Sequence, residues 1–390
     1  MSDSGGDHPL SGYTIIHAES IDQAIELAKA CPIIGHGSIE VAKIHEVSMQ
    51  VTPKAFVSAG FDLADQDSMR DNTALRGTIM RIMFVGVGAL GSYFGGALAE
   101  AGHDVTLLIR NKAHRDAIRA DGLILHRDGV EARIDPVVVD TETAGDAGIA
   151  DIVIVFTKTG ATKAALQSAT PVIGPDTRLV TVQNGLGNAE ALAAFVPMDQ
   201  VIYGTTMAPG DMVAPGVVST HGSHVTQFRA AGENPVTARM ADDLAAMLSA
   251  AGIDTRVNPD VDRVIWAKVA FNCAMNSLCA LLDTSPGPLL DSGEMKALVT
   301  ATIMEGCDVA AAVGVEVDRD GVHRTLEMVH REHRGHVPSM LVDFRNRQPT
   351  EIASLNGAVV ALGARHGVPT PRNETLLALV RAREAQYLKP

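Results

Sequence analysis

The sequence of 390 residues predicts an α/β domain followed by an all-helical C-terminal domain, with a small βαβ segment as an N-terminal extension. From Met80, short apolar runs alternate with helical patterns, which is typical of an α/β sheet of parallel strands. After about Pro259 the strand patterns stop and long helical patterns follow. The predicted divisions are a βαβ segment at 1–47, a linker at 48–79, an α/β domain at 80–258 and a helical domain at 259–390.

The N-terminal extension shows the order strand, helix, strand. Residues 12–18 are extended in character, and Ser20 can cap a helix that runs to Ala30. Residues 38–47 alternate roughly as a strand does. Residues 48–79 have no sustained period and carry several aspartates, which predicts a linker.

In the α/β domain the expected strands are 82–87, 105–109, 152–156, 179–182 and 201–205, with helices at 91–101 and 161–169. The expected helices of the C-terminal domain are 260–283, 294–313, 322–330 and 351–366. An α/β domain followed by a helical one leaves a cleft between them, where a substrate can meet a cofactor.

A glycine-rich turn directly follows the first strand of the α/β domain. Gly86, Gly88 and Gly91 have the spacing G-x-G-x-x-G, with a strand before them, a helix after them and a second strand at the right distance. This context favours a Rossmann-like dinucleotide-binding domain over a structural glycine turn. The cofactor-binding residues expected here are Gly86, Val87, Gly88, Ala89, Leu90 and Gly91. Residues 82–99 contain no charge and reach transmembrane length, but a strand, a tight turn and a helix start explain them better.

The end of the second strand indicates which dinucleotide is bound. An NAD-specific domain places an acid there to accept hydrogen bonds from the ribose 2′-hydroxyl, whereas an arginine suits a 2′-phosphate. This chain has Arg110, followed closely by Lys112. The pattern favours NADPH/NADP over the alternative that Arg110 is an ordinary solvated residue at a strand end.

A polar ladder lies on an otherwise apolar helix of the C-terminal domain. Lys268, Asn272 and Asn276 stand at i, i+4 and i+8, so they share one helix face. Asparagine is a poor helix former, and a buried polar group costs free energy unless it has a partner. The ladder therefore favours a binding or catalytic site over a solvent-facing stripe.

Three further polar positions keep two interpretations each. Ser339 and Thr350 can be helix N-caps or functional groups. Asn184 can occupy a left-handed turn position, or it can contact a ligand at the carboxyl end of a parallel strand. His221 and His224 are expected at the surface, and no metal-ligand set is apparent.

Composition excludes several classes of protein. The net charge of −14 and the pI near 5.4 argue against nucleic acid as a partner, because that needs a concentrated basic surface. The first ten residues lack the basic region of a signal peptide. The four cysteines are scattered, as expected of reduced structural thiols. We therefore expect a cytoplasmic protein with no membrane partner.

Taken together, the motifs resemble the ketopantoate reductase (2-dehydropantoate 2-reductase) family from about Met80 to Glu384. The residues that carry this resemblance are the glycine loop from Arg81, Gln183-Asn184-Gly185, Trp266-Ala267-Lys268 with Asn272 and Asn276, Ser339-Met340, Thr350-Glu351, and Asn356-Gly357.

The resemblance implies NADPH-dependent reduction of a 2-oxo acid on the route to pantothenate and coenzyme A. It implies that Lys268 is catalytic, with Glu351 as its acidic partner. It also implies substrate contacts from Asn184, Asn272, Asn276 and Ser339. Lys158, Asn184 and Glu351 would lie near the cofactor. A small-molecule 2-oxo acid is the expected partner, and a homodimer is compatible with these features.

Two alternatives remain beside this interpretation. One is the same reaction on a different 2-oxo acid, and the other is a non-catalytic NADPH-binding sensor. The complete set of Lys268, Asn272 and Glu351 argues against a sensor, which needs no proton donor. Residues 1–79 are additional to the family, and 12–47 resembles the back half of a YCII-related (DGPF) domain.

Overall fold

The structure is a computed structural model that describes residues 80–222 and 224–388. The strand–helix–strand segment expected at 12–47, the linker expected at 48–79 and Cys31 lie outside the described residues.

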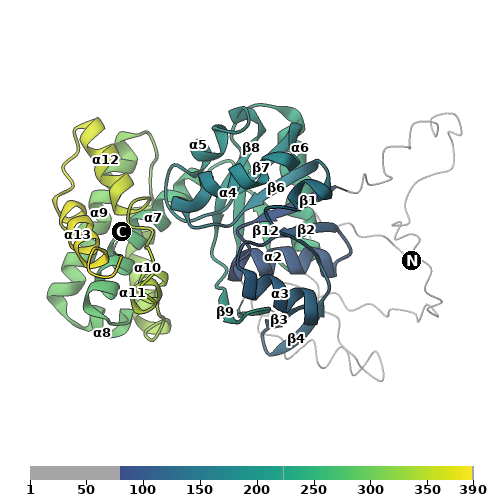
Figure 1. Cartoon of the computed structure of the whole chain (residues 1–390). Coiled ribbons are helices and arrows are strands. Elements are labelled where there is room, and N and C mark those ends of the chain that lie inside the picture. The colour runs from purple at the N-terminus through teal and green to yellow at the C-terminus, as the bar shows by residue number, and fades with distance from the viewer. Residues whose placement is uncertain (1–79, 223, 389–390) are drawn as a thin grey trace, which may run out of the picture. The chain divides into compact units, whose positions relative to one another are not determined.

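An eight-stranded sheet forms the centre of the α/β domain (Figure 1). Its strand order is β12-β11-β8-β7-β6-β1-β2-β5. The six strands from β8 to β5 pair in parallel, whereas β11 runs antiparallel to β8. The expectation of a parallel sheet is therefore correct for these six strands and wrong at β11. The strands are β1 (Arg81–Val85), β2 (Asp104–Leu108), β5 (Val137–Val139), β6 (Ala150–Val155), β7 (Ile173–Thr181), β8 (Val201–Thr206), β11 (Thr226–Ala230) and β12 (Thr255–Val257).

A second, four-stranded sheet was not predicted. Its order is β4-β3-β10-β9, with β3 and β10 parallel and both outer pairs antiparallel. Helix α2 contacts strands of both sheets, so this small sheet is part of the same domain. The strands are β3 (Leu123–Arg127), β4 (Val130–Ile134), β9 (Asp211–Ala214) and β10 (Val217–Thr220).

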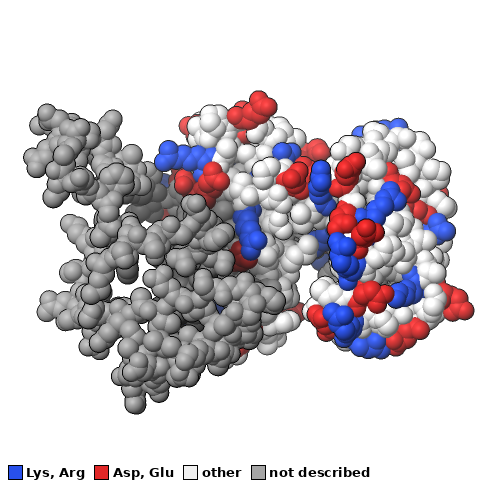
Figure 2. All heavy atoms as spheres, turned by 180° about the vertical axis from the view of Figure 1, so that it is seen from behind, with Lys and Arg blue, Asp and Glu red and all other residues white. Residues whose placement is uncertain are grey.

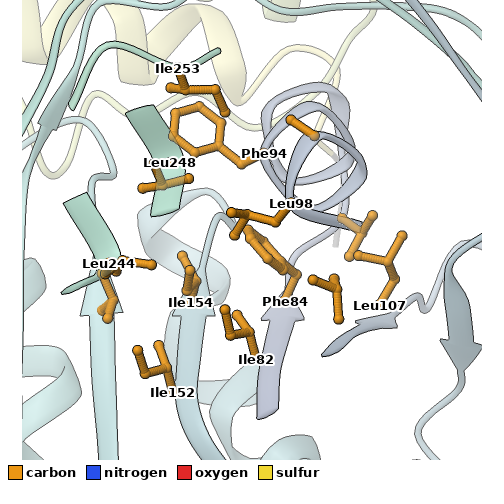
Figure 3. Close-up of a cluster of buried hydrophobic side chains, with 14 of the residues drawn as sticks. Ile82, Phe84, Phe94, Leu98, Leu107, Ile152, Ile154, Leu244, Leu248 and Ile253 are labelled. Carbon is orange, nitrogen blue, oxygen red and sulfur yellow. The ribbon is translucent and has the colours of Figure 1, made fainter. Parts of the chain in front are cut away.

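Both faces of the large sheet are buried, which explains the continuous apolar run of β1. Ile82 and Phe84 point to one face, where they pack with Phe94 and Leu98 of α2 and with Leu244 of α6 (Figure 3). Met83 and Val85 point to the other face, which α4 and α5 cover. Burial of each such side chain contributes about 1.5–3 kcal/mol. The helices of this domain are α2 (Ala89–Glu100), α3 (Lys112–Asp121), α4 (Thr162–Ala169), α5 (Asn188–Ala193) and α6 (Pro235–Ala250).

From Val261 onward the described chain is helical, and α7 is its central element. α7 packs against α9, α11 and α13, and most of its length is buried. By length and composition α7 could cross a membrane, but here it forms the core of a helical bundle. The helices are α7 (Val261–Leu282), α8 (Pro286–Asp291), α9 (Gly293–Ala312), α10 (Arg319–Glu332), α11 (Ser339–Arg345), α12 (Asn356–His366) and α13 (Pro371–Glu384).

The helix expected at 351–366 begins only at Asn356, because the backbone of Leu355 (φ −98°, ψ −102°) lies outside the helical range. Residues 352–355 instead form a turn, in which the main-chain N–H groups of Ser354 and Leu355 donate to the main-chain oxygen of Glu351 at 3.1 Å. Thr350 Oγ1 accepts the N–H of Ile352 at 3.2 Å, so it caps this turn and not a helix.

The described cysteines, Cys273, Cys279 and Cys307, are free and buried in the helical domain. Burial raises the pKa of the Cys279 thiol to about 12, so the group is neutral near pH 7. These thiols behave as small apolar core residues.

Candidate active site

The carboxyl ends of five neighbouring strands form a row along one edge of the large sheet. In the order β8, β7, β6, β1, β2, this row carries Thr206, Asn184, Thr159, Gly86 and Arg110. Neighbouring strands lie about 4.8 Å apart, so the row extends over roughly 19 Å. Open α/β sheets bind their ligands at this edge.

The glycine loop at the end of β1 is shaped by two close contacts. Gly86 has φ +86°, and a Cβ atom there would lie 2.3 Å from the backbone nitrogen of Thr157. A Cβ atom on Gly91 would lie 2.7 Å from the oxygen of Gly86. Side chains at these two positions would therefore push β1, β6 and α2 apart.

The middle glycine faces open space instead. Gly88 is exposed, and a Cβ atom there would meet nothing within 4 Å. It is the N-cap of α2 and makes no side-chain cap, and the first turn contains no acid. The first N–H groups of α2 have no partner within the helix. Together with the neighbouring Val87, Ala89 and Leu90, this arrangement fits the pyrophosphate of a dinucleotide.

Arg110 stands two residues beyond β2, next to the glycine loop. Its side chain is exposed, and within the described residues it has no ion pair. Lys112, the first residue of α3, forms an ion pair with Asp116. Arg110 is therefore free to meet an anion at this end of the row, whereas Lys112 already has a partner.

Lys268 reaches the opposite end of the row from the middle of α7. Its ammonium donates a 2.5 Å hydrogen bond to the main-chain oxygen of Thr206, the last residue of β8. Burial lowers the pKa of Lys268 to about 8, and the negative charge of Glu351 opposes this shift. A lysine in this state can give up a proton near neutral pH.

Asn272 and Asn276 follow Lys268 on α7 at the predicted spacing. Asn276 is buried and Asn272 is half-buried. Neither side-chain amide has a hydrogen-bond partner among the residues that the structure describes, although nearby Ser277 bonds to Asn356 at 3.0 Å. Their donors and acceptors are therefore available to a ligand.

The carboxylate of Glu351 lies at the middle of the row. It accepts the backbone N–H of Thr159 at 3.4 Å, the Thr159 hydroxyl at 3.5 Å and the Asn184 amide at 3.5 Å. Burial raises the pKa of Glu351, against the lowering effect of these hydrogen bonds. The expected direct pairing with Lys268 is not among the ion pairs of the described chain, so the two groups interact here through their charges only.

Asn184 does not occupy the left-handed turn position that was one of its two interpretations. Gly185 takes that conformation, with φ +90°. It lies so close to Ser354 that a Cβ atom on it would be 2.7 Å from the main-chain oxygen of Ser354. The N–H of Leu186 also donates to that oxygen at 2.9 Å. The loop after β7 is thus docked on the turn that carries Glu351.

Lys158 also joins the two domains. Its ammonium donates to Asp343 Oδ1 at 2.5 Å and to the oxygen of Pro349 at 2.9 Å. Ser339 is the first residue of α11 and is exposed; the N-cap is Pro338, so Ser339 does not cap this helix. Ser339 has no hydrogen-bond partner in the part of the chain that the structure describes.

Sequence reasoning missed three members of this cluster. Thr206 is the last residue of β8 and Thr159 follows the end of β6 by four residues, and these positions were the available signal. Asp343 stands four residues after Ser339 on α11, and no feature of the sequence separates it from an ordinary surface acid.

Metal ligands and charged surfaces add no second site. Within residues 80–222 and 224–388 no group of three or more His, Cys, Asp or Glu side chains could hold a metal ion. His221 is exposed and His224 is half-buried.

Acidic and basic side chains are interspersed over the visible face of the helical domain (Figure 2). Exposed ion pairs such as Arg334 with Asp291 contribute little to stability, because water and salt screen their charges.

Two family models match the chain. The model described as Ketopantoate reductase PanE/ApbA matches residues 82–233, and the model described as Ketopantoate reductase PanE/ApbA C terminal matches residues 260–384. Among curated relatives, the 2-dehydropantoate 2-reductase of Halobacterium salinarum is 35% identical over 308 residues, which is 77% of this chain and 98% of that protein. The 2-dehydropantoate 2-reductase of Aquifex aeolicus is 31% identical over 80% of this chain and 99% of its own.

Solved structures are similar over a comparable share of the chain. D-mandelate dehydrogenase in a ternary structure with NADH and anilino(oxo)acetate has a TM-score of 0.75 and 30% identity, covering 79% of this chain and 99% of that one. The 2-dehydropantoate 2-reductase of Geobacter metallireducens has a TM-score of 0.72 and 31% identity, covering 78% of this chain and 99% of that one.

Proposed function

Because this chain belongs to the ketopantoate reductase family, we propose that it reduces 2-dehydropantoate to pantoate with NADPH, in the biosynthesis of pantothenate and coenzyme A. That the chain is an oxidoreductase with a nicotinamide dinucleotide cofactor follows from the family. The choice of NADPH and of this substrate is the proposal.

The observation that carries it is the row of strand ends from Arg110 to Thr206. Arg110, which has no ion pair among the described residues, suits a 2′-phosphate at one end, and the open glycine loop suits the pyrophosphate. At the other end stand Lys268 and the two asparagines of α7, whose amides bond to no other described residue. The nicotinamide, when bound, supplies a hydride to the carbonyl carbon of the substrate.

The protein's own groups supply the proton and the orientation. Lys268 holds a proton on Nζ and delivers it to the carbonyl oxygen as negative charge develops there. Only one of its three N–H donors is used by Thr206, so others remain for the substrate. Asn272, Asn276 and Ser339 would bind the carboxylate and hydroxyl of the acid. Glu351 favours the charged form of Lys268, and Asn184 helps to hold Glu351.

A second candidate substrate class is supported by one finding. The similar D-mandelate dehydrogenase was solved with NADH and anilino(oxo)acetate, an oxo acid whose oxo carbon carries a phenyl ring through an N–H group. The alternative enzymatic function is therefore the reduction of an aryl 2-oxo acid. The alternative non-enzymatic function is that of a sensor that binds NADPH without turnover.

Steady-state kinetics with 2-dehydropantoate, phenylglyoxylate and short aliphatic 2-oxo acids, each with NADPH and NADH, test the proposal. We expect the highest kcat/KM for 2-dehydropantoate with NADPH. A higher value for phenylglyoxylate would favour the alternative substrate, and tight NADPH binding without turnover of any acid would favour the sensor.

A further inference from the structure

We propose that Glu384, in the last turn of α13, is a positioning residue that holds the backbone around Glu351 in its active conformation. The role rests on the proposed function, because it acts through Glu351. Neither the sequence motifs nor the family resemblance assigns a role to Glu384.

Two hydrogen bonds carry the inference. Glu384 Oε1 accepts the backbone N–H of Thr350 and the Thr350 hydroxyl, both at 2.7 Å. Thr350 directly precedes Glu351, and its hydroxyl oxygen also accepts the N–H of Ile352 on the other side. The residues that flank Glu351 are therefore connected to one carboxylate oxygen. Because two donors of Thr350 bind the same oxygen at 2.7 Å, the position of that oxygen restricts where the backbone beside Glu351 can lie.

A residue just beyond this end of α13 contacts the segment before Thr350. The Tyr387 hydroxyl donates to the main-chain oxygen of Gln348 at 3.1 Å. The Tyr387 ring meets Phe344 edge to face, with centroids 6.0 Å apart and an interplanar angle of 77°. Phe344 follows Asp343, the partner of Lys158. Glu384 and Tyr387 thus contact the stretch 344–350 at Phe344, Gln348 and Thr350.

The other end of α13 is anchored in the core. Glu305, which is buried, accepts the N–H groups of Arg372 and Asn373 at 3.0 Å and the Asn373 amide at 2.9 Å. A helix of 14 residues spans about 21 Å at 1.5 Å per residue. Helix α13 therefore connects the buried Glu305 at its start with the turn beside Glu351 at its end.

Glu384 acts on Glu351 through geometry more than through charge. The charges with the largest effects on the pKa of Glu351 are those of Lys158 and Asp343. The charge of Glu384 acts instead on Asp343, whose pKa it raises. The position of the Glu384 oxygen, and not its negative charge, is therefore the property that matters for Glu351.

Three single variants of the full chain separate these effects. Glu384→Ala removes the acceptor, and we expect kcat to fall about 10- to 100-fold, because a catalytic group displaced by about 1 Å costs on this order. Glu384→Gln keeps an acceptor oxygen without the charge, so kcat should stay within about fivefold of wild type. Glu374→Ala is the matched control: Glu374 is on the same helix and accepts the Thr370 hydroxyl at 3.2 Å, but at the far end. It should leave kcat unchanged.

A double variant shows whether Glu384 acts through Glu351. In the Glu351→Gln background, the additional change Glu384→Ala should lower kcat by less than about twofold, because residues that act as a unit are not additive. If the two losses multiply, or if Glu384→Gln loses as much as Glu384→Ala, the positioning role is wrong. Should Glu384→Ala not fold by circular dichroism, Thr350→Ala takes its place in the same cycle; it removes the hydroxyl that donates to Glu384 and accepts the N–H of Ile352.

The outcome is distinguishable from a failure of the proposed function. If wild-type enzyme does not reduce any 2-oxo acid, the proposed function fails, and the role of Glu384 fails with it because that role acts through Glu351 in this reaction. If wild type is active and Glu351→Gln is impaired while Glu384→Ala keeps wild-type kcat, the inference about Glu384 alone is contradicted.

Discussion

The ammonium of Lys268 donates a 2.5 Å hydrogen bond to the oxygen of Thr206, and this bond joins the central helix of one domain to the last residue of a strand in the other. It holds the proposed proton donor at the carboxyl edge of the sheet, where a dinucleotide would bind. Burial at this position lowers the pKa of the lysine to about 8. The buried position of Lys268 at this edge of the sheet therefore accounts both for its hydrogen bond to Thr206 and for its lowered pKa.

The lowered pKa predicts how the rate depends on pH. Lys268 is protonated below pH 8 and loses its proton above it, so kcat/KM for reduction should fall as pH rises through about 8. The profile should be measured with NADPH from pH 6 to 10. In Lys268→Ala the residual activity should lack this alkaline limb. A wild-type profile that stays flat to pH 10 would show that Lys268 is not the titrating acid.

Cofactor preference should depend on Arg110. Wild-type enzyme should prefer NADPH to NADH, and Arg110→Asp should shift the preference toward NADH, because a carboxylate repels a 2′-phosphate and can accept hydrogen bonds from a ribose 2′-hydroxyl. Lys112→Ala is the control, since Lys112 is paired with Asp116. The measurement is the ratio of kcat/KM for the two cofactors. Equal use of both by the wild type would contradict the role of Arg110.

Residues 1–79 should be dispensable for reduction. Both family models match within 82–384, and the Halobacterium relative covers 98% of its own length while matching 77% of this chain. A chain that begins at Met80 should fold and retain kcat. Sedimentation, circular dichroism and steady-state kinetics check this. A truncated chain that is folded but inactive would mean that the extension contributes to catalysis.

Much of the α/β domain is predictable, because its central strands are buried on both faces and appear as continuous apolar runs. The strands of the second sheet are not, since they are short and several of their residues are exposed: β9 is exposed along its whole length. β11 likewise has only five residues, and three of them, Thr226, Gln227 and Arg229, are polar. Such patterns are too short to indicate which sheet a strand joins.

The candidate site, like the fold, is predictable from the sequence only in part. The ladder of Lys268, Asn272 and Asn276 follows from helix periodicity alone. The partners of Lys268 and Lys158 do not, because Thr206 contributes a backbone oxygen and Asp343 is 185 residues from its lysine. The start of α12 was also not predictable. It begins at Asn356 because the backbone of Leu355 is not helical, and no capping side chain marks this position in the sequence.

The most direct test is the substitution Lys268→Ala, in which the turnover rate with the oxo acid substrate and the affinity for NADPH are measured on the same preparation. Because the glycine loop belongs to the other domain, NADPH affinity should remain close to that of wild type. The loss of a general acid should lower kcat by about 10²–10⁴-fold. A folded Lys268→Ala enzyme with near-normal kcat would contradict the proton-donor role and with it the proposed mechanism.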